Sequence, residues 1–397
     1  MSRFPRRSLL GTLAFASGQM VPGPARAQPA SGDGHAAGRV AVPSASGLST
    51  IPRRPGDAPG FTASLDRAAL KATSGGWARE ITSRQLPIAA NLAMAHLFLN
   101  PGGSREMHWH DSAEWAYVID GRAQVTVLDP GGEPEVFNVA AGDLWYFPRG
   151  HAHAIQTIGA APCHALLAFN DGLYSEHGTF GITDLVSRLD PASLSRDLGV
   201  PASVLAGLPV GETYIMQGPV LAIDSEAARA ESRWAPERSH GFGLSAAGPA
   251  VSVPGGTIHV ASSREFPASA DMTGLLLRLQ PGAGQSLHWH PAADEMLFVL
   301  GGQARVSLFG PDKHLAVAGI GPGDCAYIPR NAAHLVEAAG PDGAELLAVQ
   351  NAGHHSAAAL ADWTARAPSH LLANNLRLSG TPMPAFQRGR PIVSPLG

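Results

Sequence analysis

Residues 102–121 read GGSREMHWHDSAEWAYVIDG, and the order of histidine, tryptophan and glutamate in this stretch decides the fold. Side chains on a β-strand alternate between its two faces, so His108 and His110 point to one side and Trp109 points to the other. Glu114 returns to the face of the histidines if the strand continues or carries a small bulge. Two imidazoles and a carboxylate on one face predict a metal site inside a β-barrel.

The same pattern returns in the second half of the chain. PGGSREMHWHDSAEW at 101–115 reappears as PGAGQSLHWHPAADEM at 281–296. AGDLWYFPRGHAH at 141–153 reappears as PGDCAYIPRNAAH at 322–334. Blocks that keep their order at a nearly constant offset indicate an internal duplication.

Each half therefore contains three histidines and one glutamate that could bind a metal ion. The two sets are His108, His110, Glu114 and His153, and His288, His290, Glu295 and His334. A lone histidine is usually a core residue with satisfied hydrogen bonds, but that reading does not explain four ligand-type residues recurring at matched spacing. No cysteine takes part, which favours Mn, Fe, Ni or Zn.

The surrounding sequence is typical of short strands joined by turns. AEWAYVIDGRAQVTVLD (113–129) contains two apolar runs broken at an Asp-Gly pair, and DEMLFVLGGQARVSLFG (294–310) contains two broken at a Gly-Gly pair. Such pairs mark hairpins. Helical periodicity occurs only in residues 181–190 and 358–367. We expect an all-β protein with two tandem jelly-roll barrels and a few flanking helices.

Composition excludes several functions. The chain has 397 residues, enough for two domains, but only 15% are charged and the formal net charge is −4. It has no basic run, so neither nucleic acid nor an anionic membrane surface is expected as a partner.

Residues 1–27 resemble an export signal. Arg6 and Arg7 precede an apolar stretch, and ARA closes the segment as a small-residue cleavage pattern. The adjacent arginines predict the twin-arginine route, which exports folded proteins. Residues 28–60 are rich in Ala, Gly, Pro and Ser and are predicted to form a flexible arm. We expect a periplasmic or secreted protein whose mature form does not contact the membrane.

The spacing of glycine, histidines and glutamate in residues 102–121 resembles the first motif of the cupin superfamily, and residues 141–153 resemble its second motif. Two tandem cupin domains are therefore expected, at 61–235 and 236–375, followed by an irregular tail at 376–397. The segments SGGWARE, REMHWH and NDGLYSEHGTF resemble those of the bacterial and fungal oxalate decarboxylases in particular.

This resemblance implies a function for several residues. It implies one manganese ion in each half, dioxygen as cosubstrate, and cleavage of oxalate to formate and carbon dioxide. Arg105 presents a permanent cation with a fork matched to a carboxylate, and we expect it to bind the substrate. Glu176, in the Gly-rich loop SEHGT, is the implied proton donor on a lid. Leu167 and Phe169 are predicted to line an apolar pocket, too tight for a large substrate.

Other functions stay open at this point. The same scaffold could act as an oxalate oxidase that produces hydrogen peroxide, or as a non-enzymatic bicupin of the storage or sugar-binding type. A dioxygenase or isomerase for a larger substrate is a further alternative. The relatives form trimer-based assemblies, so a homo-oligomer, a trimer or a hexamer, is expected.

The second half departs from the first. Gln285 stands at the position of Arg105, and Ala348 stands where relatives often carry a glutamate. We therefore predict a second metal site that is structural or supports redox chemistry, with little turnover. His354 and His355 are interpreted as a solvated pair in a loop.

Overall fold

The computed structural model describes the part of the chain that contains both predicted barrels. The described residues are 60–176, 178–208, 210–225, 227–228, 239–310, 313–378 and 393–395. The predicted export signal and nearly all of the predicted arm lie outside them. Within the described residues, none of the helices combines the length and the apolar character needed to cross a membrane.

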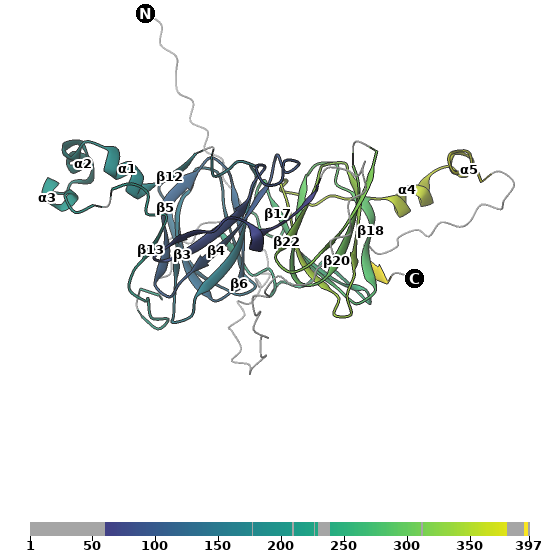
Figure 1. The fold of residues 1–397 in the computed structure, drawn as a ribbon, viewed down its shortest axis with the longest axis horizontal. Helices are drawn as coiled ribbons and strands as arrows, with labels where there is room; N and C mark the ends of the chain where they lie inside the picture. Colours follow the sequence, from purple (N-terminus) through teal and green to yellow (C-terminus); the bar gives the residue numbers. More distant parts are fainter. Residues whose placement is uncertain are drawn as a thin grey trace, which may run out of the picture. The chain divides into compact units, whose positions relative to one another are not determined.

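The first half forms two antiparallel sheets. Its strands are β2 (Lys71–Thr73), β3 (Gly76–Ile81), β4 (Ala93–Leu99), β5 (Gly103–His110), β6 (Glu114–Asp120), β7 (Arg122–Leu128), β8 (Pro134–Ala140), β9 (Leu144–Phe147), β10 (Ala152–Thr157), β11 (Cys163–Phe169), β12 (Thr179–Gly181) and β13 (Ile215–Gln217). One sheet contains β9-β6-β11-β4-β3-β2, and the other contains β12-β5-β10-β7-β8 with β13 beside β5. Figure 1 shows these strands wrapped around one interior.

The second half repeats this arrangement. Its strands are β15 (Val251–Val253), β16 (Gly256–Ala261), β17 (Thr273–Leu279), β18 (Ala283–Trp289), β19 (Glu295–Gly302), β20 (Ala304–Phe309), β21 (Leu315–Ile320), β22 (Asp324–Ile328), β23 (Ala333–Ala338), β24 (Ala344–Gln350), β25 (Ala358–Ala359) and β26 (Val393–Pro395). One sheet contains β22-β19-β24-β17-β16-β15, and the other contains β21-β20-β23-β18-β25 with β26 beside β18. The predicted all-β architecture of two tandem barrels is confirmed.

The two halves exchange short strands. β1 (Thr62–Ser64), at the start of the first half, pairs with β22 of the second barrel. β14 (Gly241–Phe242), near the start of the second half, pairs with β9 of the first barrel. Each barrel therefore completes a sheet with backbone from outside its own repeat, and this couples the folding of the two halves.

Apolar residues form three clusters. One fills the first barrel and another fills the second. The third lies between the halves, where Met94, Trp115 and Leu166 of the first pack with Met272, Leu276 and Met296 of the second. Trp115 and Met94 are fully buried there, so the outer faces of the two large sheets form a shared core.

Helices follow each barrel, as expected. The first group is α1 (Ile182–Arg188), α2 (Pro191–Leu198) and α3 (Ala202–Leu205), and the second is α4 (Leu360–Arg366) and α5 (Ser369–Leu376). α1 packs on β12 and β5, and α4 packs on β18 and β25, so each group flanks its own barrel (Figure 1). The predicted irregular tail differs at Val393–Pro395, which pairs with β18 as β26. The other residues of the tail beyond 378 lie outside the described residues.

Replacing Gly274 with alanine should destabilise the shared core. A Cβ atom at Gly274 would lie 2.0 Å from Cζ2 of Trp115, and this buried indole has no room to move. Over-packing of this kind costs about 1–3 kcal/mol. Urea unfolding should detect the loss, whereas Gly248→Ala, where nothing lies within 4 Å of an added Cβ, is the control. Equal stability of both variants would show that the two sheets do not pack as described.

Candidate metal centres and substrate pocket

A β-bulge places Arg105 beside the metal-binding histidines. His108 on β5 lies opposite His153 on β10, but Arg105 lies opposite Ile155, so three residue steps on β5 match two on β10. The extra residue reverses the alternation and turns Arg105 to the inner face. Simple alternation along β5 would put Arg105 on the face opposite His108, and the bulge corrects this. The second half has the same shift between Gln285 and His288.

The first predicted ligand set converges inside the first barrel. One ligand atom from each of His108, His110, Glu114 and His153 lies within 4.8 Å of all the others, and all four residues are buried. Oε2 of Glu114 lies 3.3 Å from Nε2 of His110 and 3.8 Å from Nε2 of His153. Its other oxygen, Oε1, accepts a hydrogen bond of 2.8 Å from Trp145 Nε1.

The hydrogen bonds of the six histidines fit metal binding. Each Nδ1 lies within hydrogen-bonding distance of a backbone carbonyl, which fixes the proton on Nδ1 and directs the lone pair of Nε2 inward. The carbonyls belong to Glu106, Ser112, His151, Ser286, Ser356 and Ala332 for His108, His110, His153, His288, His290 and His334 respectively. Nε2 of His153, His288 and His334 and Oε1 of Glu295 are buried with no hydrogen-bond partner. Such atoms are costly to bury unless a cation binds them.

Burial favours the neutral, metal-binding form of His108, His153 and His288. It lowers the pKa of His153 and of His288 to about 3, and it lowers that of His108 well below the usual value. For Glu114, burial alone would raise the pKa. The adjacent imidazoles of His110 and His153 and the hydrogen bond from Trp145 outweigh it, so the pKa of Glu114 falls and the carboxylate stays ionised.

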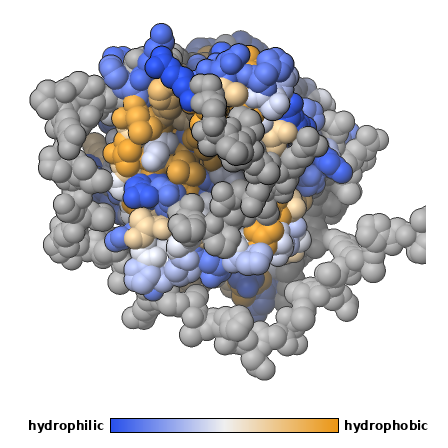
Figure 2. Space-filling model, turned by 90° about the vertical axis from the view of Figure 1, so that its right-hand side faces the viewer, coloured by the Kyte–Doolittle hydropathy of each residue, from blue (hydrophilic) through white to orange (hydrophobic). Residues whose placement is uncertain are grey.

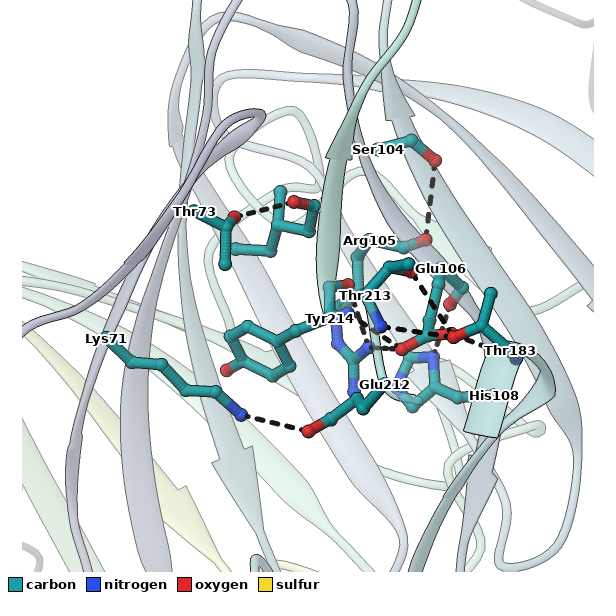
Figure 3. Close-up of polar contacts among 11 residues, drawn as sticks. Lys71, Thr73, Ser104, Arg105, Glu106, His108, Thr183, Glu212, Thr213 and Tyr214 are labelled. Atoms are coloured by element: carbon teal, nitrogen blue, oxygen red, sulfur yellow. Dashed lines mark hydrogen bonds and ion pairs between the residues drawn. The ribbon is translucent and has the colours of Figure 1, made fainter. Parts of the chain in front are cut away.

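Arg105 is buried beside this centre and held by a residue far along the chain (Figure 3). It is 6% exposed, and one guanidinium NH donates to the backbone carbonyl of Tyr214 at 3.0 Å. The guanidinium also lies 4.3 Å from the centre of the Tyr214 ring, a cation–π contact. Lys71 lies on this ring too, at 3.5 Å, and forms an ion pair with Glu212.

Glu106 anchors the segment that carries Tyr214. This carboxylate is 1% exposed and accepts hydrogen bonds from the backbone NH of Tyr214 and from the hydroxyl and backbone NH of Thr183. It also lies 3.6 Å from the Arg105 guanidinium. Tyr214 has a φ of +61°, a strained conformation for a bulky residue, which the hydrogen bond to Glu106 helps to hold. Sequence reasoning missed Glu106 and Tyr214, although Glu106 follows Arg105 directly.

Glu176 lies at the rim of the first centre, where its carboxylate binds Arg84. Arg84 donates two hydrogen bonds to it, at 2.9 and 2.7 Å, and the two side chains are 66% and 40% exposed. The start of the loop is anchored more firmly, because Tyr174 and Ser175 both donate to Glu80. Arg84 and Glu80 were not foreseen from the sequence.

A cavity of about 730 Å³ leads to the first centre. Arg105, Glu176, Leu167 and Phe169 all line it together with the ligands His108, His110 and Glu114, so the predicted substrate-site residues meet in one space. The expectation of a tight pocket is wrong. The volume is ample for a drug-sized ligand, because the loop with Glu176 stands at the rim, and size alone does not exclude a larger substrate.

The second set also converges. Ligand atoms of His288, His290 and His334 lie within 4.8 Å of one another. Oε2 of Glu295 lies 3.2 Å from Nε2 of His290, and Oε1 lies 3.5 Å from Nε2 of His334. The neighbouring carboxylate of Asp294 is used elsewhere, by the backbone NH of Arg330 and by asparagine side chains. The second half has one more residue between His290 and Glu295 than the first has between His110 and Glu114, and it is accommodated without displacing Glu295.

Three residues of the second half test the expectations for its centre. The solvated-pair interpretation is wrong for His355, which is half-buried, with its ring 5.6 Å from that of His290 and its Nδ1 3.1 Å from Oε1 of Gln350. His354 is exposed, as expected, and contacts Ser263. Gln285, at the position of Arg105, is 3% exposed, and its carbonyl oxygen has no hydrogen-bond partner, so no cation faces this centre from β18.

Fold and site together define a bicupin metal protein. The family model described as Cupin matches residues 65–204 and again 242–383. Among curated proteins, the oxalate decarboxylase of Bacillus subtilis (strain 168) is 34% identical over 305 residues, covering 77% of this chain and 78% of that protein. A probable oxalate decarboxylase of Arthroderma benhamiae is 32% identical and covers 75% of this chain and 74% of that protein.

Solved structures agree with this relationship. A structure of Bacillus subtilis oxalate decarboxylase with Mn(II) centres has a TM-score of 0.79 at 31% identity, covering 86% of this chain and 90% of that chain. The structure of the same enzyme at pH 4.6 also has a TM-score of 0.79. The chain belongs to the cupin family and, within it, to the bicupin oxalate decarboxylases. We therefore class it as a decarboxylase enzyme.

Removing one histidine from each set should remove one metal ion each. We expect about two ions per chain in the purified protein, one in His153→Ala, one in His334→Ala and none in the double variant, because each set loses a ligand that no neighbour replaces. Elemental analysis gives the stoichiometry, and thermal melting with and without chelator should show a lower Tm after metal removal. His164→Ala, a buried histidine outside both sets, is the control. Two ions in the double variant would contradict this assignment.

Proposed function

We propose that the chain is an oxalate decarboxylase that converts oxalate to formate and carbon dioxide at its first centre, with manganese and dioxygen. The observation that carries this proposal is the buried guanidinium of Arg105 on the same inner face as His108, inside the cavity. A fixed cation next to a cation-binding site favours a small dianion. Three curated relatives bear the name oxalate decarboxylase, in one case with the word probable.

The donor set fits manganese. Three imidazole nitrogens and one carboxylate suit a borderline divalent ion, and His108, His110, Glu114 and His153 would hold it beside the cavity that Arg105 lines. When bound, manganese together with dioxygen supplies the reversible one-electron chemistry that weakens the carbon–carbon bond. Arg105 holds the carboxylate of oxalate, and the contacts of Tyr214 and Glu106 hold Arg105.

The remaining step is a proton transfer, and we assign it to Glu176. Loss of carbon dioxide from oxalate leaves a carbon that must take up one proton to become formate. Overall, the oxalate dianion and one proton give formate and carbon dioxide, with no net oxidation. To act, Glu176 must leave Arg84 and turn into the cavity. The ion pair between them is exposed, and such pairs contribute little to stability, so the loop can exchange between the two positions.

The position of Glu176 also favours a second activity on the same scaffold. If the carboxylate stays with Arg84, the carbon is not protonated, and oxidation of oxalate to two molecules of carbon dioxide with formation of hydrogen peroxide becomes the alternative outcome. His177, which follows Glu176 in SEHGT, lies outside the described residues. We therefore propose decarboxylation as the main reaction and oxidation as the side reaction.

The second centre has a different role in this proposal. It retains its ligands, but Gln285 replaces the arginine and Ala348 is buried where relatives often carry a glutamate. Without a cation or an acid, oxalate lacks both its binding partner and its proton donor there. We propose a second manganese ion that supports the structure or redox chemistry, with little turnover.

The protein is further proposed to be exported by the twin-arginine route and to form a homo-oligomer. An apolar pair lies beside the matched strands of each half: Trp109 stacks on the exposed Phe180 in the first, and Trp289 lies against the exposed Trp363 of α4 in the second. Figure 2 shows apolar residues exposed on this side of the second barrel, and strands β18, β20 and β21 of that barrel carry the exposed side chains of Leu287, Phe309, Leu315 and Val317. We define two patches, one around Trp109 and Phe180 in the first half and one around Trp289 and Trp363 in the second. A contact between the first patch of one copy and the second patch of another would bury both, and repeated contacts of this kind can close into a trimer.

Export and assembly can be checked together. Lysine at both Arg6 and Arg7 should trap the precursor in the cytoplasm, as cell fractionation would show. The exported protein should sediment as a trimer or hexamer, and Trp363→Ser, which removes a 66% exposed apolar side chain, should shift it toward monomer. Trp77→Ser, outside both patches, is the control. A monomeric exported protein would rule out the assembly.

Product analysis tests the activity. The manganese-loaded mature chain is given oxalate in aerated, mildly acidic buffer, and formate and hydrogen peroxide are measured together. We expect formate in large excess. Glu176→Gln should lower formate production about 10²–10⁴-fold, the usual contribution of a general acid. Arg105→Gln, which imitates the second centre, should lower kcat/KM for oxalate.

Matched controls separate the outcomes. Glu133→Gln, on an exposed turn, should leave both products unchanged. Hydrogen peroxide as the main product would show that the protein is an oxalate oxidase and not a decarboxylase. If a fully metal-loaded protein forms neither formate nor hydrogen peroxide, both the decarboxylase and the oxidase activities are refuted, and the non-enzymatic bicupin becomes the favoured function.

A further inference from the structure

The two halves hold their ligand carboxylates with donors from different strands. In the first half, the indole NH of Trp145 on β9 donates to Oε1 of Glu114 at 2.8 Å. Trp145 lies opposite Ala116 on β6. The matched position in the second half is Ala326 on β22, which lies opposite Leu297 on β19 and has no side-chain donor.

Gln350 supplies the missing donor from the other neighbouring strand. It is the last residue of β24, lies opposite Glu295 and is fully buried. Its side-chain NH₂ donates to Oε2 of Glu295 at 2.7 Å. The matched residue of the first half is Phe169, which lies opposite Glu114 and cannot donate. Trp145 therefore matches Ala326, and Phe169 matches Gln350. Each half has one donor to its ligand carboxylate, but on a different neighbouring strand.

His355 fixes the direction of this amide. Nδ1 of His355 lies 3.1 Å from Oε1 of Gln350, and an NH there makes the oxygen the acceptor, so the NH₂ faces Glu295. The same amide nitrogen lies 3.3 Å from Nε2 of His290. The next residue, Ser356, accepts from Nδ1 of His290 through its carbonyl at 2.9 Å. Two consecutive residues of one loop therefore hold two parts of the second centre.

This loop corresponds to the one that carries Glu176 in the first half. Both follow matched strands of the two barrels, β11 and β24. In the first half the loop turns its carboxylate to Arg84 at an exposed rim, whereas in the second it packs His355 against the centre. The loop with Glu176 can exchange between two positions, whereas the loop with His355 is packed against the second centre.

We propose that Gln350, oriented by His355, positions the Glu295 carboxylate for the metal ion of the second centre and takes the place that Trp145 has in the first. Residues of this kind orient a metal ligand and slow release of the ion without touching it. Loss of the donor frees Glu295 to rotate and weakens its hold on the ion. This inference uses manganese from the proposed function only as the probe ion.

The test measures manganese release and needs no oxalate. In the full-length mature His153→Ala protein, only the second centre is loaded, so release to excess EDTA reports on that centre. Gln350→Met keeps the volume but removes the donor, and we expect release about 10–100-fold faster. His355→Phe should act in the same direction with a smaller effect. The EPR spectrum of the bound Mn(II) should change in both variants, because the field around Glu295 changes.

Phe169→Met, the matched position of the first half, is the control and should leave release from the second centre unchanged. Far-UV circular dichroism and thermal melting confirm that each variant is folded. If Gln350→Met does not fold, His355→Phe, which changes a loop residue, still tests the proposal. Unchanged release and an unchanged EPR spectrum in a folded variant would overturn the proposal, whatever the outcome of the oxalate assay.

Discussion

Four polar ligand side chains can stay inside an apolar barrel only if every buried polar atom has a partner. The structure meets this constraint in two ways at each centre. Backbone carbonyls take the Nδ1 proton of every ligand histidine, and the inward Nε2 atoms and carboxylate oxygens are left for a cation and for one donor. The strand order, the bulge and the turns before His153 and His334 all serve to bring these atoms to one point. The turn is kept with a different residue in each half, because Gly150 and Asn331 both have positive φ.

The bulge in β5 and β18 adds a second inward position to a strand already used for two histidines. In the first half this position is Arg105, and a charged guanidinium can be buried there because Tyr214 and Glu106 bind it. In the second half the same backbone presents Gln285, and the centre is neutral on that side. The same barrel backbone therefore gives an open first centre that is suited to an anion and a second centre that is enclosed by its own loop. The difference rests on a few side chains and not on the fold.

The sequence already identified much of this. The alternation of His108 and His110, the glutamates and the later histidines predicted both ligand sets, and the structure brings each set together. The duplication predicted the second barrel, and the Arg-to-Gln change predicted the neutral face of the second centre. The exposure of His355 and the tightness of the pocket were predicted wrongly, since neither follows from local pattern.

What the sequence determined by itself is what short spacing encodes: strand parity, hairpin turns, ligand type and the repeat. The tertiary structure decided the rest. Tyr214 reaches Arg105 across 109 residues, and Arg84 reaches Glu176 across 92, so no local period relates them. Gln350 and Glu295 are 55 residues apart and meet because β24 lies beside β19. Alternation along one strand shows which face a side chain takes, but only the pairing of strands and the packing of loops shows which partner lies opposite.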